Sequence, residues 1–189
     1  MAVSGCKIAI SGDLGSGKTT VTRYLIEKYG FQTFSTGAYQ RELAAKMGMS
    51  TLELNEYAET HPEIDRDIDG KLTEIGKMPG NIIFDSRMAW HFVENAFKVY
   101  IKCDLDIAAS RIFYDRGRGH VESYGHHQHA KGYILNRRAS EERRYWNKYG
   151  VMITDMSNYD FVIDASNRSI EETAEGIYSE MQKFFAIKA

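Results

Sequence analysis

An eight-residue stretch near the N-terminus constrains the fold of this chain more than any other feature. Residues 12–19, Gly-Asp-Leu-Gly-Ser-Gly-Lys-Thr, match the spacing G-x-x-x-x-G-K-[ST] of a phosphate-binding P-loop. Residues 7–10 before it are largely apolar and predict a buried strand, and residues 19–28 have the apolar spacing of a helix. This order of strand, loop and helix is the context that the motif requires. The alternative is a glycine-rich turn that matches the pattern by chance.

The residue types in this loop explain how it would bind phosphate. Glycine permits backbone conformations that other residues resist, so successive N–H groups and the N-terminus of the next helix can point at one anion. Lys18 adds a cation for the β- and γ-phosphates, and the hydroxyl of Thr19 can bind Mg²⁺. Asp13 is a carboxylate inside an anion-binding loop, so we expect its side chain to point outward. The residues predicted to bind ATP in this stretch are Gly12, Gly15, Ser16, Gly17, Lys18, Thr19 and Thr20.

Length and composition are typical of a globular domain. The chain has 189 residues, with 26% charged residues, 43% hydrophobic residues and a net charge of −2. This charge argues against a general nucleic-acid binder, and no apolar run approaches the length of a membrane span. The N-terminus lacks a signal-peptide pattern, so we expect a cytoplasmic protein. We also expect a monomer that acts on a small molecule, without nucleic acid or membrane. We expect Cys6 and Cys103 to pack as small apolar side chains.

The order of the predicted elements indicates an α/β fold of the P-loop NTPase class. Apolar strands alternate with helices, which predicts a five-stranded parallel sheet flanked by helices. The phosphate-binding loop then lies at the carboxyl ends of the strands, where such sheets bind ligands. The strands are expected at residues 7–10, 31–35, 81–85, 98–102 and 161–164.

Two longer segments interrupt this alternation. The first has a helical pattern, with a capping box from Ser50 to Glu53 and a helix that starts at Pro62. The second begins with a glycine- and histidine-rich piece, residues 116–132, and ends with an arginine-rich helix, residues 135–148. Long insertions in a compact domain are usually functional. The predicted division of a single kinase domain, 1–189, is a core (1–35, 79–114, 150–189), an acceptor-binding insertion (36–78) and a lid (115–149).

Arginines in these segments are the candidates for phosphate binding, because guanidinium groups match phosphate oxygens and phosphoryl transfer needs positive charge on the moving group. Arg137 and Arg144 are seven residues apart, so they share one helix face about 10 Å apart along its axis. Glu141 can pair with Arg137 while the site is empty. Arg41 and Arg87 are candidates for the phosphate of an acceptor. The alternatives are a solvated, ion-paired helix and ordinary surface arginines.

Two features bear on metal binding. Asp85 ends an apolar strand, as a Walker B acid does, and from there it could hold Mg²⁺ through water. The alternative is a strand-end aspartate that begins a turn. The four histidines of one segment match no standard zinc spacing, and a solvated loop is the simpler interpretation. They are His120, His126, His127 and His129.

Four further stretches are distinctive: residues 35–41, 62–69, 85–90 and 137–150. Together with the P-loop they resemble the nucleoside monophosphate kinases, and within them the short, archaeal-type cytidylate kinases. The resemblance covers nearly the whole chain. Met88 departs from it, since the bacterial enzymes have at this place an aspartate that helps to recognise cytosine. Asp13 and Leu14 stand where these enzymes usually have small residues or proline.

This resemblance implies that ATP, with Mg²⁺, donates a phosphoryl group to CMP or dCMP. It implies contacts of Lys18, Arg137 and Arg144 with the transferred group. It also implies that Asn167 and Arg168 lie near the adenine. The residues implied for the acceptor are Thr36, Arg41, Asp65 and Arg87. The remaining alternatives are a kinase for another small acceptor, such as a different nucleotide, a nucleoside or a sugar acid, and a nucleotide-binding regulator without transfer activity.

Overall fold

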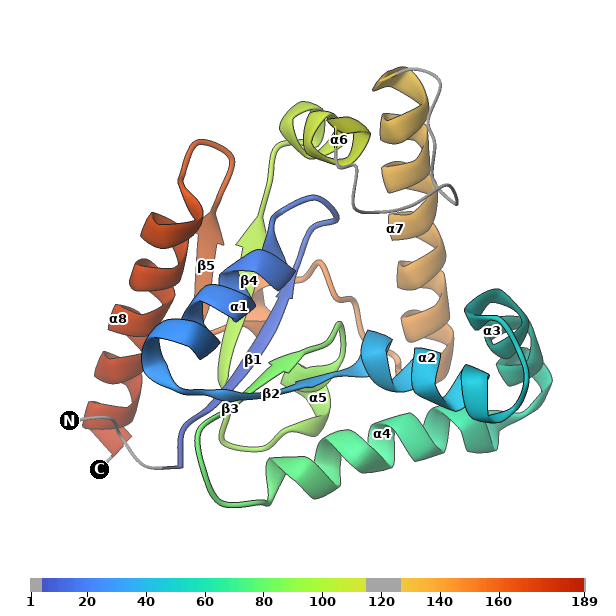
Figure 1. Cartoon of the computed structure of the whole chain (residues 1–189), viewed down its shortest axis with the longest axis horizontal. Helices are drawn as coiled ribbons and strands as arrows, with labels where there is room; N and C mark the ends of the chain where they lie inside the picture. Colours follow the sequence, from blue (N-terminus) through green and yellow to red (C-terminus); the bar gives the residue numbers. More distant parts are fainter. Residues whose placement is uncertain (1–4, 115–126, 189) are drawn as a thin grey trace.

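A single parallel sheet forms the centre of the computed structural model, which describes residues 5–114 and 127–188 (Figure 1). In these residues the sheet has five strands in the order β2-β3-β1-β4-β5, and every neighbouring pair is parallel. The predicted α/β P-loop NTPase fold is therefore confirmed. The strands are β1 (Lys7–Gly12), β2 (Gln32–Ser35), β3 (Ile82–Asp85), β4 (Phe97–Lys102) and β5 (Phe161–Asp164).

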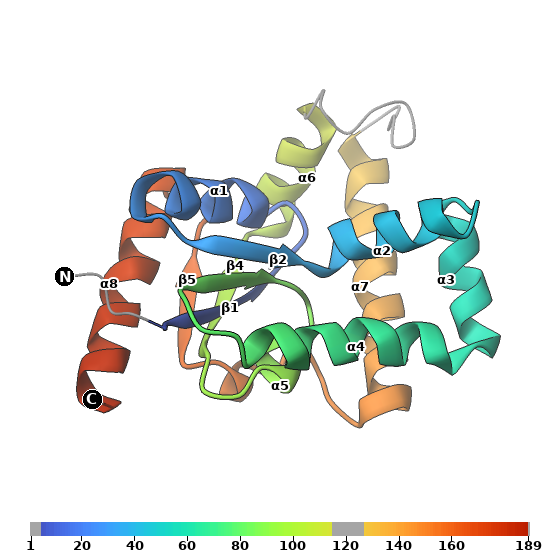
Figure 2. The same cartoon turned by 60° about the horizontal axis from the view of Figure 1, so that its bottom comes forward.

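Helices cover both faces of this sheet, as parallel strands that are apolar on both sides require (Figure 2). Ile8 and Ile10 of β1 pack in a cluster with residues of α1 and α8, whereas Ala9 between them packs in a cluster with residues of α4 and α5. This alternation follows from the two-residue period of a strand. The helices are α1 (Lys18–Tyr29), α2 (Thr36–Lys46), α3 (Thr51–Thr60), α4 (Pro62–Gly76), α5 (Ala89–Phe92), α6 (Leu105–Tyr114), α7 (His127–Tyr149) and α8 (Ile170–Lys188).

Local sequence signals set several of the helix starts. Ser50 and Glu53 form the predicted capping box at the start of α3, with Glu53 accepting from the Ser50 N–H at 2.7 Å. Ser169 and Glu172 do the same before α8. Pro62 is the first residue of α4, where its missing N–H has no intrahelical partner to lose.

The segment between β4 and β5 differs from the prediction. Helix α7 begins at His127, well before the predicted start at Leu135, and thus includes Gly132. Ala130 and Ile134 are buried in a cluster with residues of α6, so packing outweighs the poor helix propensity of glycine at this place. Residues 115–126 of the predicted lid, including His120 and His126, lie outside the described residues.

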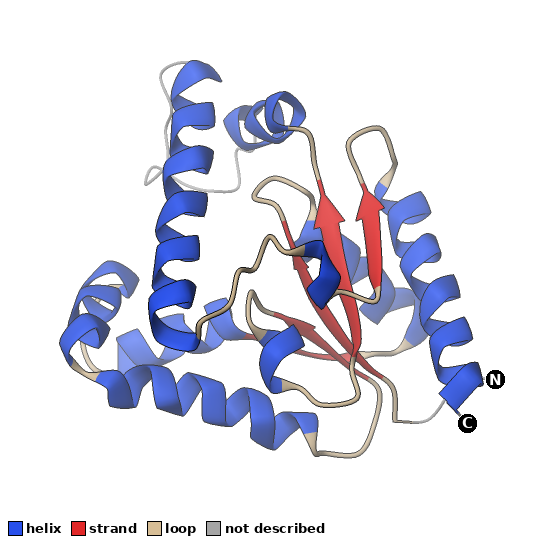
Figure 3. Ribbon diagram, turned by 180° about the vertical axis from the view of Figure 1, so that it is seen from behind, coloured by secondary structure: helices blue, strands red, loops and turns tan. Residues whose placement is uncertain are grey.

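Helix α4, which follows β2 in the sequence, and the C-terminal end of α7, which follows β4, pack in the same cluster on one face of the sheet. Figure 3 shows α7 standing beside α3 and α4, with α8 at the opposite side of the sheet.

Cys6 and Cys103 are buried and free, as expected. Within the described ranges, no helix combines the length and apolar character that a membrane crossing requires.

Candidate active site

The phosphate-binding loop connects β1 to α1 at the carboxyl end of the sheet. Gly15 and Gly17 have positive φ angles of 77° and 83°, which side-chain-bearing residues rarely adopt. A Cβ atom on Gly15 would lie 2.7 Å from the carbonyl oxygen of Ala108, so the packing of α6 also requires glycine there. The Ser16 hydroxyl is buried and has no hydrogen-bond partner within the described chain. Thr19 is exposed. The loop thus contains one buried hydroxyl that lacks a hydrogen-bond partner among the described residues, that of Ser16, and one exposed threonine, Thr19.

A cavity of about 1870 Å³ opens beside this loop and extends to α2, α4 and α7. It brings together almost every residue that the sequence predicted for the site. Gly12 does not line the cavity, but its carbonyl accepts a hydrogen bond from Arg87, which does. The predicted residues that line it are Gly15, Ser16, Gly17, Lys18, Thr19, Thr20, Thr36, Arg41, Asp65, Asp85, Arg87, Arg137, Arg144 and Arg168.

Lys18 and Asp85 form an ion pair at the floor of this cavity, with side chains only 18% and 13% exposed. Asp85 stands beside Ile10 in the sheet register, so the last residue of β3 reaches the loop that follows β1. Burial lowers the pKa of Lys18, and the adjacent Asp85 carboxylate opposes this shift only in part. The pair leaves the charge of Lys18 balanced by a carboxylate that a phosphate group could replace.

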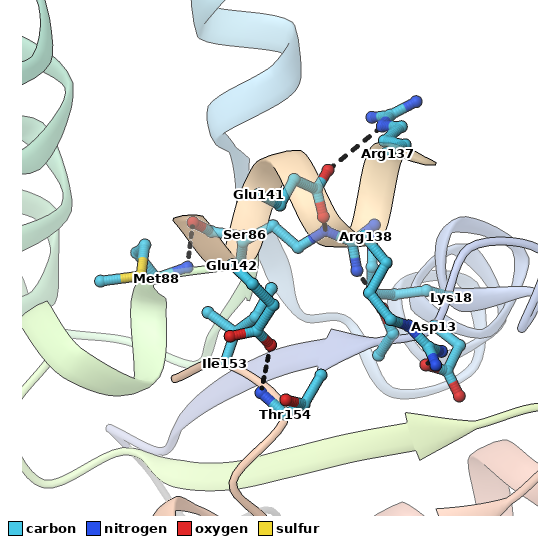
Figure 4. A network of polar contacts seen from close by, with 12 residues as sticks. Asp13, Lys18, Ser86, Met88, Arg137, Arg138, Glu141, Glu142, Ile153 and Thr154 are labelled. Carbon is cyan, nitrogen blue, oxygen red and sulfur yellow. Dashed lines mark hydrogen bonds and ion pairs between the residues drawn. The ribbon is translucent and has the colours of Figure 1, made fainter. Parts of the chain in front are cut away.

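A single carboxylate joins two of the predicted arginines. Glu141 accepts from the Nε of Arg137 at 3.1 Å through one oxygen (Figure 4). Its other oxygen lies 3.1 Å from the Nε of Arg87. The predicted pair of Arg137 and Glu141 is therefore confirmed, and the structure adds Arg87. The Glu141 side chain is 18% exposed, so both arginines converge on a largely buried charge.

The C-terminal half of α7 contacts α4 through a second set of ion pairs. Arg144 donates to Asp65 at 2.7 Å, and Lys148 contacts the other oxygen of the same carboxylate. The Tyr149 hydroxyl donates to Asp69 at 2.5 Å. Asp65 is 9% exposed, and a carboxylate so buried requires this compensation by cations. In this structure Arg144 therefore has an acidic partner, as Arg137 has.

The expected outward orientation of the Asp13 side chain is not found. This side chain is only 10% exposed and accepts hydrogen bonds from the Tyr100 hydroxyl at 2.8 Å and the Cys103 N–H at 2.9 Å. Arg138 of α7 completes the set with an ion pair (Figure 4). The expectation was wrong because it allowed Asp13 only solvent as an alternative to the anion. Sequence reasoning missed Arg138, although a carboxylate in an anion-binding loop indicates that a cation must lie nearby.

Arg111 of α6 is a second residue that sequence reasoning missed. Its guanidinium donates to the carbonyls of Ala165 at 2.8 Å and Ser166 at 3.2 Å, in the connection between β5 and α8. It also reaches the Gly15 carbonyl at 3.4 Å. Arg111 thus links the phosphate-binding loop to the segment that leads to Arg168, and both arginines line the cavity.

A parallel sheet, a P-loop that opens a helix, and a cavity lined by cations define a P-loop nucleotide-binding protein. A family model described as an AAA domain matches residues 8–122. Curated relatives are cytidylate kinases: that of Pyrococcus abyssi is 37% identical over 88% of this chain and 89% of the relative, and that of Archaeoglobus fulgidus is 36% identical over 93% and 94%. The cytidylate kinase of Methanocaldococcus jannaschii is also 36% identical, over 87% and 90%. The protein therefore belongs to the cytidylate kinase family, as its sequence stretches indicated.

Solved structures agree with this fold. A shikimate kinase from Bacteroides thetaiotaomicron superposes with a TM-score of 0.63 at 16% identity, over 94% of this chain and 98% of the other. An uncharacterized protein from Eubacterium ventriosum gives a TM-score of 0.69, also at 16% identity and with the same coverage. At this identity the likeness shows the fold alone, so it does not support a sugar acid as the acceptor.

Proposed function

We propose that this protein is a nucleoside monophosphate kinase that transfers the γ-phosphoryl group of ATP to CMP or dCMP. The observation that carries the proposal is one cavity lined both by Lys18 of the P-loop and by Arg87, Arg137 and Arg144. Such an arrangement suits two phosphate-bearing substrates that meet in one place. Membership of the cytidylate kinase family supports the choice of acceptor.

On the donor side, the loop N–H groups, the Ser16 hydroxyl and Lys18 bind the β- and γ-phosphates of ATP. Arg168, at the connection before α8, lies toward the adenine. Thr19 and Asp85 both line the cavity, and their hydroxyl and carboxylate oxygens are ligands of the kind that Mg²⁺ prefers, so they fit a bound ion. The metal would neutralise charge on the donor phosphates.

On the acceptor side, Arg41 and Arg87 bind the monophosphate, and Thr36 and Asp65 complete the acceptor pocket. An oxygen of this monophosphate forms the new bond to the γ-phosphorus while the bond to the bridging oxygen of ADP breaks. The acceptor is already an anion at neutral pH, because the second pKa of a phosphate monoester is about 6. No general base is therefore needed.

Arg137 and Arg144 stabilise the charge on the group in transfer. In this structure each contacts a carboxylate, Glu141 or Asp65, at 3.1 Å and 2.7 Å. The phosphates of ATP and CMP would take over these guanidinium groups, since charge-assisted contacts to phosphate use the same donors. Transfer would then require that both substrates are present before the arginines leave their carboxylates.

The same proposal gives each segment of the chain a role. Residues 36–78 form the acceptor-binding insertion, residues 115–149 form the lid, and the rest forms the core of one domain. We further propose that the protein acts in the cytoplasm as a monomer.

A coupled assay of ADP release tests the proposal. ATP with Mg²⁺ is supplied with CMP, dCMP, UMP, AMP or GMP, and the expected result is that CMP or dCMP gives the highest kcat/KM. Turnover of AMP or GMP alone would contradict the cytidine acceptor. The absence of ADP above background with all five would contradict the function as a nucleoside monophosphate kinase.

A further inference from the structure

Asp13 lines the cavity, but the residues that fix it to the sheet do not. Its carboxylate oxygens accept from the hydroxyl of Tyr100, which lies in β4, at 2.8 Å, and from the N–H of Cys103, which directly follows β4, at 2.9 Å. Its own N–H donates to the carbonyl of Ile101 at 2.9 Å. With an exposed fraction of only 10%, this carboxylate has little freedom to change partners.

Arg138 provides the cationic partner of this carboxylate, and it comes from α7 (Figure 4). The Arg138 side chain is 40% exposed, so it lies at the edge of the protein, while Asp13 lies inside. A buried carboxylate with a charged partner is held more strongly than one with neutral donors alone. The pair thus links the phosphate-binding loop directly to the helix that bears the predicted phosphate-binding arginines.

Helix α7 has two distinct faces at this point. Ala130, Ile134 and Arg138 follow one another at four-residue spacing and therefore lie on one side. The first two are buried in a cluster with residues of α6, and Leu14 of the phosphate-binding loop packs against that cluster. Arg137 and Arg144 lie on an adjacent side, about 100° to 120° around the helix axis from Arg138, and this side lines the cavity.

We infer that Asp13 and Arg138 form a tether that sets the rotation and position of α7 relative to the phosphate-binding loop. Adjacent helix residues point about 100° apart around the axis, so fixing Arg138 on Asp13 directs Arg137 into the cavity. Leu14 adds an apolar contact with the cluster that α6 and this face of α7 form. This inference rests on the proposed function. It makes Asp13 and Arg138 positioning residues, because they act on the reaction through Arg137 and Arg144.

Asp13→Asn gives the sharpest test, because an argument from charge alone predicts no loss of activity, whereas the tether predicts a loss. Removing a negative charge from an anion-binding loop should help ATP to bind. The tether predicts that kcat with CMP nevertheless falls about tenfold, because small displacements of catalytic groups are costly. The KM for ATP should stay unchanged or fall. An unchanged or increased kcat would overturn the inference.

Arg138→Gln and the double variant complete a mutant cycle. Arg138→Gln should also lower kcat about tenfold, and the double variant should be no slower than either single variant, since both remove one interaction. Arg138→Lys, which retains the charge, should recover part of the loss. Losses that multiply in the double variant would show independent roles and overturn the tether.

Arg143→Gln is the matched control. Arg143 is an exposed arginine of the same helix, does not line the cavity, and loses the same charge in this substitution. Its kcat should stay within about twofold of the unchanged protein. If the kcat of Arg143→Gln falls as far as that of Arg138→Gln, the loss reflects the total charge of the helix, and the inference fails.

Hydrogen exchange provides a readout that does not depend on turnover. In Arg138→Gln the amides of residues 133–144 should exchange about tenfold faster, because α7 loses a contact with the core, whereas Arg143→Gln should leave them unchanged. Unchanged exchange in Arg138→Gln would contradict the tether. The absence of ADP release by the unsubstituted protein would instead contradict the proposed function, so the two failures are distinguishable. Because Arg138 is partly exposed, its variants keep the test available even if Asp13→Asn does not fold.

Discussion

The phosphate-binding loop and the cavity face of α7 present positive charge to the same cavity in different ways. In the proposed function the loop uses backbone N–H groups, and its shape depends on Gly15 and Gly17 and on the close approach of Ala108. Helix α7 uses the guanidinium groups of Arg137 and Arg144, and each of these contacts a carboxylate. The first arrangement is built into the backbone, whereas the second depends on side chains that have other partners.

This difference follows from the size of the charges. A peptide N–H is only a partial charge, so several of them can converge on one place without a counter-ion. A full charge in a half-buried position requires a partner, and Lys18, Arg87, Arg137 and Arg144 all have one. We therefore expect the loop to bind nucleotide directly and the arginines to respond to it. The predictions below separate these two contributions.

The largest effect is expected for Lys18→Ala, which removes the one cation that belongs to the loop itself. The substitution also leaves Asp85 buried beside the phosphates without its partner. We expect kcat to fall about 1000-fold or more, as for other groups that stabilise transition-state charge. The coupled assay measures this. Lys183→Ala, at an exposed ion pair of α8, is the control and should stay within about twofold.

Arg137→Ala and Arg144→Ala test the cavity face of α7. Each should lower kcat about 100-fold or more, because an arginine on the transferred group acts chiefly in the transition state. The dissociation constant of ATP, measured by calorimetry, should change less than about threefold, because the loop remains intact. An equal loss of ATP binding and turnover would show that these arginines only bind nucleotide. Their role would then not differ from that of the loop.

Glu141→Gln sharpens the comparison, because Glu141 is the shared partner of Arg87 and Arg137. The neutral side chain competes less with phosphate, so the KM for ATP should fall or stay the same. The two arginines lose their alignment, so kcat should fall about tenfold. Steady-state kinetics with both substrates measures this split. A higher KM with an unchanged kcat would show that Glu141 only shapes the pocket.

The smallest effect concerns pH. Burial lowers the pKa of Lys18 in the free protein, while Asp85 and Glu141 oppose the shift and Arg87 adds to it. Below this pKa Lys18 is charged, so kcat/KM for ATP should be constant there and decrease as the pH rises through it. The decrease should begin at a lower pH than an ordinary lysine would give. In Lys18→Arg the guanidinium stays charged, and this alkaline decrease should disappear.

Much of the fold could be predicted because its signals are local. The P-loop, the apolar strands and the capping boxes at Ser50 and Ser169 each depend on residues within a few positions of one another. The start of α7 could not be predicted in this way. Gly132 and the histidines indicate a loop, and only the packing of Ala130 and Ile134 against α6 makes the segment helical.

The site was predicted in part for the same reason. Motif spacing indicated Lys18, Asp85 and the α7 arginines, which the structure gathers around one cavity. The charged partners of the site residues, by contrast, could not be predicted. Arg138 with Asp13, and Arg144 with Asp65, are far apart in the sequence and meet only because α7 packs beside the loop and α4. No local pattern indicates which acid a given arginine will contact.

A crystal structure with CMP and a non-hydrolysable ATP analogue would test most directly whether substrates release the α7 arginines from their carboxylates. We predict that the guanidinium groups of Arg137 and Arg144 lie within about 3 Å of phosphate oxygens. Their contacts with Glu141 and Asp65 should then be broken or shared with the phosphates. If both arginines keep their carboxylate partners and have no phosphate within hydrogen-bond distance, the account of α7 as the responding half of the site is wrong.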